Sequence, residues 1–189
     1  MRYLLLIGCM ALNATICMGQ IKIKPALGIN FTDFSKDPGT GQYKSQVGYQ
    51  IGGSVAIGGK WYLEPGIYWT HKSTEYQTNQ SNAQDIEYKM SGIRIPVAVG
   101  YNLLGKVKKL VNVRPMAGVS AFFLTGVDDL DKASFKTATW GLFAGAGADI
   151  FNLFMDVQYE WSLSKVSDTQ VDVGNARSLF INVGMRFGL

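Results

Sequence analysis

The sequence predicts an all-β fold, an eight-stranded antiparallel up-and-down barrel that crosses a membrane. Three observations predict it. Apolar and polar residues alternate in eight successive segments, the connections between segments differ strongly in length, and the chain opens with a stretch typical of a secretion signal. The composition agrees, because only 17% of the 189 residues are charged, whereas soluble domains carry roughly 25%.

Residues 1–19 are predicted to be a signal peptide that is cleaved off, which leaves residues 20–189 as one barrel domain. Arg2 supplies the positive charge at the start, and a short apolar stretch follows. Cys17 and Gly19 are the small residues that a signal peptidase needs before its cut. The apolar stretch is shorter than the roughly 20 residues of a membrane-spanning helix. The sequence therefore predicts secretion.

A lipid anchor on Cys9 is the alternative for the same stretch. The run from Leu6 to Cys9 resembles the lipobox of lipoproteins, but the few residues between Arg2 and Gly8 leave almost no apolar region for such a signal. Cys17 also lies within the predicted signal, so the predicted mature chain has no cysteine. Neither a disulfide framework nor a zinc site is expected in it.

Eight segments show the alternation of strands whose two faces meet different surroundings. In chain order they cover residues 21–32, 47–57, 61–70, 93–101, 111–123, 140–150, 155–163 and 179–187. Apolar residues dominate the odd-numbered positions of each segment except the sixth, from Trp140 to Ile150, where they occupy the even-numbered ones. Each segment has the length of a tilted membrane-crossing strand, about 9–11 residues.

The second face of these segments is polar, small or charged, which decides between two kinds of barrel. Its charged residues include Glu64, Arg94, Arg114, Asp156, Glu160 and Arg186. A soluble sandwich or lipocalin-like barrel also alternates but needs an apolar interior, whereas a small membrane barrel has a polar one. Eight strands leave a lumen that side chains fill. We therefore expect the three carboxylates to pair with the three arginines in a salt-bridged plug.

The connections are expected to place long loops at one end of the barrel and short turns at the other, as in outer-membrane barrels. The long polar connections are Ser35–Gln46, Ser73–Asp85, Thr125–Lys136 and Ser164–Arg177. The short ones are Gly58–Lys60 and Phe151–Leu153, and Leu103–Leu110 is intermediate. Aromatic residues suited to the membrane interfaces lie mostly toward strand ends: Tyr43, Tyr49, Trp61, Trp69, Tyr101, Trp140, Tyr159 and Trp161. These features predict a location in the bacterial outer membrane.

The residues also resemble a known family, the PorT-like outer-membrane β-barrel domains of Bacteroidetes. The resemblance is carried by the predicted signal end before Gln20, Ile95-Pro96-Val97, Arg114-Pro115, Gly145-Ala146-Gly147 and a seventh strand with Tyr159. More distantly, the chain resembles the eight-stranded transmembrane domains of OmpA and OmpX. The resemblance covers the whole predicted mature chain. It implies a link to protein secretion or envelope assembly and assigns no functional residue.

The last predicted strand looks like the C-terminal signal by which the barrel-assembly machinery recognises its clients. Asn182, Gly184 and Phe187 match the pattern, whereas Leu189 replaces the usual terminal aromatic residue. A final strand with an apolar outer face is suited to pair with the insertase by β-augmentation. We therefore expect this machinery to be a partner during insertion.

The first functional hypothesis is a small non-enzymatic outer-membrane barrel that presents extracellular loops for binding or for envelope- or secretion-related assembly. The loops are polar, as in Gln77–Asn82, and carry no recognisable ligand motif. Expected partners are outer-membrane lipid, lipopolysaccharide and envelope proteins. Nucleic acid is not expected, because the net charge is only +4 and the basic residues form no stripe beyond Lys106, Lys108 and Lys109.

The alternative is a hydrolase that modifies lipid A. His71, the single histidine, and Ser73 share the lipid-facing parity and resemble the His-x-Ser pair of outer-membrane lipid A deacylases, with Glu75 or Glu87 as the orienting acid. In that family the pair lies later in the chain, the alternation need not extend as far as Ser73, and geometry rather than spacing defines a triad. A histidine at the membrane rim is therefore the favoured interpretation, and no catalytic residue is assigned.

Neither a pore nor a metal site is indicated. Eight strands and a charged lumen argue against an open channel. Asp128, Asp129 and Asp131 offer oxygen ligands that suit Ca²⁺, but they lack the spacing of an EF-hand. No cofactor-binding or metal-binding residue is assigned, and no cofactor is expected.

Overall fold

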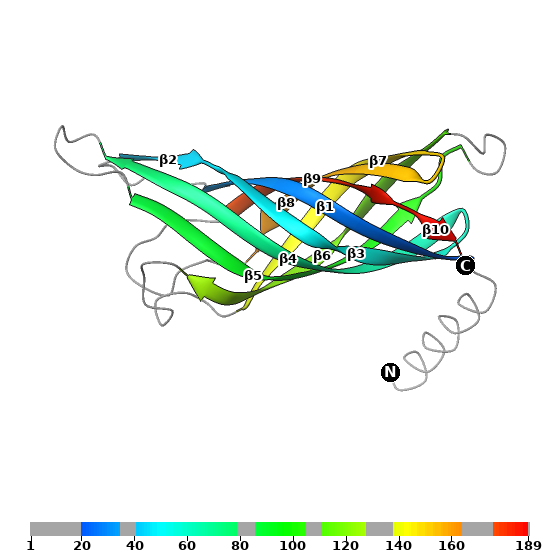
Figure 1. Cartoon of the computed structure of the whole chain (residues 1–189), viewed down its shortest axis with the longest axis horizontal. Coiled ribbons are helices and arrows are strands. Elements are labelled where there is room, and N and C mark those ends of the chain that lie inside the picture. Colours follow the sequence, from blue (N-terminus) through cyan, green and yellow to red (C-terminus); the bar gives the residue numbers. More distant parts are fainter. Residues whose placement is uncertain are drawn as a thin grey trace.

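The chain forms one closed antiparallel β-sheet, seen from the side in Figure 1. The computed structural model describes residues 20–34, 41–78, 86–104, 111–127, 138–163 and 176–188. The predicted signal peptide, residues 1–19, and Leu189 lie outside the described residues. Within the described ranges, no helix is long and apolar enough to cross a membrane.

The strands follow one another around the barrel in chain order. They are β1 (Gln20–Phe34), β2 (Gly41–Ser45), β3 (Val47–Gly58), β4 (Trp61–Thr78), β5 (Ile86–Tyr101), β6 (Val111–Val127), β7 (Ala138–Ile150), β8 (Leu153–Ser162), β9 (Ala176–Met185) and β10 (Phe187–Gly188). β2 and β3 both pair with β4 and form one crossing interrupted at Gln46. β9 and β10 both pair with β1 and form another, interrupted at Arg186.

The barrel closes where β1 meets the last crossing. β1 pairs with β3 on one side and with β9 and β10 on the other, so the described strands leave neither long edge of the sheet open. In Figure 1, blue β1 accordingly runs beside red β9 and β10. The predicted eight-stranded up-and-down barrel is therefore confirmed.

The alternation of the sequence separates two environments. Along β8, exposed and buried residues alternate from Leu153 through Glu160. Arg94 is fully buried in the lumen, whereas Leu27 and Ile67 on the outer wall are each 59% exposed. An apolar outer face and a polar interior suit a wall surrounded by lipid, the reverse of a soluble barrel.

All four predicted long connections prove to be partly strand, and β9 begins at Ala176 within the last of them. β2 lies within Ser35–Gln46 and pairs with Thr74–Thr78, the part of β4 that extends into the predicted loop Ser73–Asp85. β6 likewise continues to Val127. Alternation marks only the stretch where the two faces meet lipid and lumen. The backbone ladder needs no such contrast, so it continues into residues that are polar on both faces.

The short turns gather at the other end of the barrel, here called the short-turn end. Gly58 has φ = 134°, a region that glycine enters without a Cβ clash. Phe151, in the two-residue turn between β7 and β8, has φ = 53° although it is not glycine. Asn102 binds the β3–β4 turn, since its backbone N–H donates to the carbonyl of Lys60 at 2.8 Å.

A charged lumen as the candidate functional site

The lumen near the short-turn end holds five paired charges, here called the short-turn cluster. They are Lys24, Glu64, Arg114, Asp149 and Asp156. Their side chains come from β1, β4, β6, β7 and β8 because each occupies the inward parity of its strand. The cluster therefore joins walls of the barrel that are far apart in sequence.

Lys24 links the first strand to two distant carboxylates. Its Nζ lies 2.7 Å from Oε1 of Glu64 and 3.0 Å from Oδ2 of Asp156. The ammonium also lies 4.2 Å from the centre of the Phe154 ring. Ser54 Oγ donates a second hydrogen bond to Glu64 Oε1 at 2.7 Å. These contacts offset the cost of burying a lysine that is only 1% exposed.

Arg114 is the centre of the cluster. Its Nη2 lies 2.7 Å from Oδ1 of Asp156 and 2.9 Å from Oδ1 of Asp149, and its Nη1 donates to the hydroxyl of Tyr62 at 3.1 Å. Glu64 Oε2 lies 3.5 Å from Nη1 and accepts no hydrogen bond from the described residues. One guanidinium thus compensates three carboxylates.

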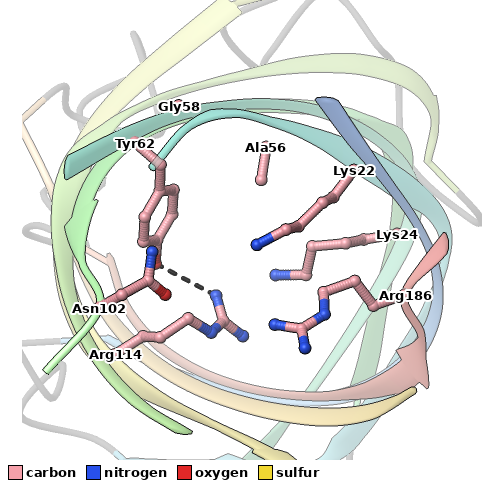
Figure 2. Close-up of a pocket in the computed structure, with 8 residues that line it drawn as sticks. All are labelled: Lys22, Lys24, Ala56, Gly58, Tyr62, Asn102, Arg114 and Arg186. Atoms are coloured by element: carbon pink, nitrogen blue, oxygen red, sulfur yellow. Dashed lines mark hydrogen bonds between the residues drawn. The ribbon is translucent and has the colours of Figure 1, made fainter. Parts of the chain in front are cut away.

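The open end of this cluster carries further cations. Figure 2 shows the side chains of Lys22, Lys24 and Arg186 extending into the lumen from one side and that of Arg114 from another. Arg186 Nη1 reaches Asp149 Oδ2 at 2.5 Å. The cavity that these residues border measures about 10 Å³, the space of about one water molecule. The mouth of the lumen is therefore filled by side chains.

A second group, the central cluster, fills the middle of the lumen around Arg94. Arg94 Nη2 and Nε donate to Glu160 Oε2 at 2.7 and 2.9 Å, and Ser120 Oγ donates to the same oxygen at 2.7 Å. The guanidinium carbon lies 4.0 Å from the centre of the fully buried Phe180 ring. Lys72 Nζ lies 5.5 Å from that ring centre. Ion pairing and cation–π contacts together offset the burial of Arg94, although its Nη1 donates no hydrogen bond to the described residues.

The predicted plug is confirmed, with two corrections to its pairs. Arg94 binds Glu160 and Arg114 binds Asp156 as expected, but Arg186 binds Asp149, a residue that the charge pattern had not singled out. Lys24, also not assigned a partner from sequence, binds Glu64 and Asp156. Asp149 and Lys24 both have the inward parity of their strands, so the sequence could have identified them as lumen residues. It could not have identified their partners, because these depend on the stagger between strands, which parity does not specify.

The candidate His-x-Ser pair occupies the barrel wall toward the long-loop end. The His71 ring stacks on Tyr49 with centroids 5.1 Å apart, and its Nδ1 lies 2.9 Å from Oγ of Ser91 on β5. His71 is half-buried, whereas Lys72 and Ser73 are both buried. Ser73 is therefore less exposed than a position facing lipid would be, although β4 pairs with β5 past both residues without a shift in register.

Other sequence candidates lie outside what the structure describes. These are the side chains of Glu75 and Glu87, and the residues Asp128, Asp129, Asp131, Lys106, Lys108 and Lys109. Within the described ranges, no group of three or more His, Cys, Asp or Glu is placed to hold a metal ion.

At the short-turn end, a hydrogen bond with Tyr101 raises the pKa of the exposed Lys60.

Comparison with known proteins agrees with this architecture. The family described as outer membrane protein beta-barrel domain matches residues 13–168. The structure of OprG from Pseudomonas aeruginosa aligns with a TM-score of 0.56 and 13% identity over 90% of this chain and 94% of that one. Neisserial surface protein A aligns with a TM-score of 0.52 and 18% identity over 88% and 95%. At these identities the likeness concerns the fold alone. No curated protein matches the sequence significantly.

Proposed function

The chain belongs to the outer membrane protein β-barrel domain family, and from this we propose that it is a non-enzymatic barrel whose long-loop end binds partners outside the cell. Its location is the bacterial outer membrane. In such barrels the short turns face the periplasm and the longer connections face outward. The family and the apolar outer wall support the location, and the filled lumen supports the assignment of binding to the loops.

The observation that carries the proposal is the plug. The short-turn and central clusters join opposite walls of the barrel through ion pairs such as Lys24 with Asp156 and Arg94 with Glu160. Carboxylates held by buried cations are poorly placed to act as a base or to pass an ion. The extracellular connections are therefore the parts of the chain suited to contact a partner.

The part of the barrel beyond the membrane gives these connections a rigid base. β2 pairs with Thr74–Thr78 of β4, and Ile86–Lys89 of β5 pair with the same strand from the other side. Three paired strands thus continue beyond the alternating segments. We propose that this extension presents the connections 35–40 and 79–85 to an envelope protein. The PorT-like resemblance supports a role in secretion or envelope assembly.

Lipid, lipopolysaccharide and the barrel-assembly machinery complete the proposed partners. The apolar outer wall supports contact with lipid and with the acyl chains of lipopolysaccharide. The last crossing has alternating outward residues, including Val183, Met185 and Phe187, which supports strand pairing with the insertase.

Site-specific crosslinking tests the proposed binding role. A photoreactive residue introduced into 79–85 should form protein adducts in intact cells, whereas the same residue in the β5–β6 connection, 105–110, should not form these adducts. An externally added protease should cleave a site inserted into 79–85 and spare one inserted into 105–110. Adducts of equal yield from both ends, or cleavage of only the second site, would contradict the proposal.

Lipid A analysis tests the non-enzymatic part. Cells that express the wild type, His71→Ala or Ser73→Ala should have lipid A of the same mass as cells that lack the protein. If lipid A lost an acyl chain in cells with the wild type but not in cells with either variant, the hydrolase alternative would be established instead. The hydrogen bond of His71 with Ser91, rather than a triad with Ser73, supports the expected result.

A further inference from the structure

An apolar groove of about 890 Å³ crosses the outer wall of the barrel. It crosses five neighbouring strands, β3, β1, β9, β8 and β7, which pair in that order. The registers place Leu27 beside Ile51 on one side and beside Val183 on the other. Val183 lies beside Met155, and Met155 beside Ala148. The groove therefore follows the hydrogen-bond direction across the wall.

Small outward residues account for the hollow. Pro25 and Ala148 line it at outward positions, where most of the wall carries larger apolar side chains. The larger side chains of Leu27, Leu153 and Met185 border it. Such a hollow offers an inserted hydrocarbon chain contacts on more than one side, which a flat wall does not.

The length and direction of the groove match one leaflet of a membrane. Five strands have four gaps of about 4.8 Å, so the groove is about 19 Å long. With strands tilted by about 40–45°, it rises about 13 Å along the membrane normal. One leaflet supplies about 15 Å, half of the hydrocarbon core. The end of the groove nearer the short turns lies at Leu153, next to the β7–β8 turn. The other end lies at Ile51, well inside β3.

We propose that this groove binds one acyl chain of a phospholipid from the periplasmic leaflet. The groove is continuous with the apolar band that faces lipid, and all thirteen residues that line it are apolar or glycine. It begins at the short-turn rim, where the head groups of the periplasmic leaflet lie, and ends near the middle of the bilayer. Lipopolysaccharide lies in the opposite leaflet and would meet only the end of the groove at Ile51.

Two matched variants on one strand test the site. Ala148→Phe places a phenyl ring in the β7 end of the groove, whereas Ala146→Phe adds the same side chain at an outward position of β7 outside the groove. After reconstitution into vesicles of phosphatidylethanolamine and phosphatidylglycerol, native mass spectrometry should find one phospholipid retained by the wild type and by Ala146→Phe. Ala148→Phe should raise the dissociation constant of this lipid by about tenfold, a difference of 1.4 kcal/mol.

Two further checks concern the folded state of each variant and the leaflet from which the bound acyl chain comes. Each variant must first show the gel shift between heated and unheated samples that marks a folded barrel. Electron spin resonance of a spin-labelled phospholipid should then show an immobilised component that is smaller for Ala148→Phe than for Ala146→Phe. Equal retention by both variants would overturn the site. If the protein retained lipopolysaccharide rather than phospholipid from a mixture of the two, the assignment of the groove to the periplasmic leaflet would be wrong.

Discussion

At the scale of single residues, the barrel depends on a few long side chains that each satisfy several partners. Arg114 is bound to Asp149, Asp156 and Tyr62 and lies near Glu64. Removing one partner from such a group costs more than the group adds as a whole, because the remaining charges stay buried. Substitutions at the centre of the cluster should therefore destabilise the barrel more than substitutions at its rim.

Arg114→Met should leave three carboxylates without their shared cation. We expect the free energy of unfolding to fall by about 3–5 kcal/mol, measured by urea titration of the barrel in detergent micelles. Lys60→Met removes an exposed cation at the short-turn end and should leave the unfolding midpoint unchanged. Equal effects of the two changes would show that the cluster has no special role.

Gly147 leaves the space into which Arg114 and Asp156 extend. A Cβ on Gly147 would overlap Oδ1 of Asp156 and lie 2.8 Å from Nη2 of Arg114. Gly147→Ala should therefore destabilise the barrel by about 1–3 kcal/mol, again measured by urea titration. Gly126→Ala is the control, since a Cβ there meets nothing within 4 Å. A change at Gly147 no larger than the one at Gly126 would refute this packing.

Inward charges could be identified from the sequence at this scale, but their partners could not. The parity of Arg94, Arg114 and Glu160 predicts that they face the lumen, since alternation reports the face alone. Which inward residues meet also depends on the stagger between strands, and this stagger brings Asp149 to Arg186. For the same reason, the parity of Ser73 did not predict that its side chain is buried.

At the scale of elements, the sequence predicted the membrane-facing core of each strand better than its ends. The segment 61–70 lies within β4, but β4 continues to Thr78. Beyond the membrane both faces meet water, and a strand can be polar throughout. The ends of β4 and β5 are fixed by pairing between strands, which composition records only weakly.

Tyr76→Pro should disrupt the extension without disrupting the barrel. Tyr76 pairs with Tyr43 on one side and Ile86 on the other, so proline removes a backbone donor from a paired strand. We expect heat-modifiability to survive and protease cleavage within 79–85 to become faster. Thr70→Pro, in the fully buried part of the same strand, should prevent folding. Loss of the folded form by both variants would show that the extension is part of the folding core.

At the scale of the whole molecule, closure joins the two ends of the chain. β1 pairs with β9 from Ala26 to Phe34 and with β10 at Lys22 and Ile23. The overall architecture was predictable from sequence because alternation, strand number and connection length all agree on one closed sheet. The apolar groove could not be predicted from the sequence, because it depends on the register in which five strands are aligned.

Deletion of Gly184–Leu189 should prevent assembly. It removes the partners of β1 near the short-turn end and, apart from Asn182, the residues that resemble the C-terminal assembly signal. We expect the truncated chain to be lost from the outer-membrane fraction and to migrate identically with and without heating. A truncated chain that still fractionates with the outer membrane and shifts on heating would refute the role of this seam.

The pairing of Lys24 also bears on the order of events during insertion. Lys24 is on the first strand, and its carboxylate partners are on β4 and β8, so its two ion pairs require a nearly complete sheet. Until then these charges would need water or the assembly machinery around them. An incomplete barrel is thus strongly penalised in lipid, whereas the finished one is not. We therefore expect the chain to leave the assembly machinery only after β1 has paired with the last strands.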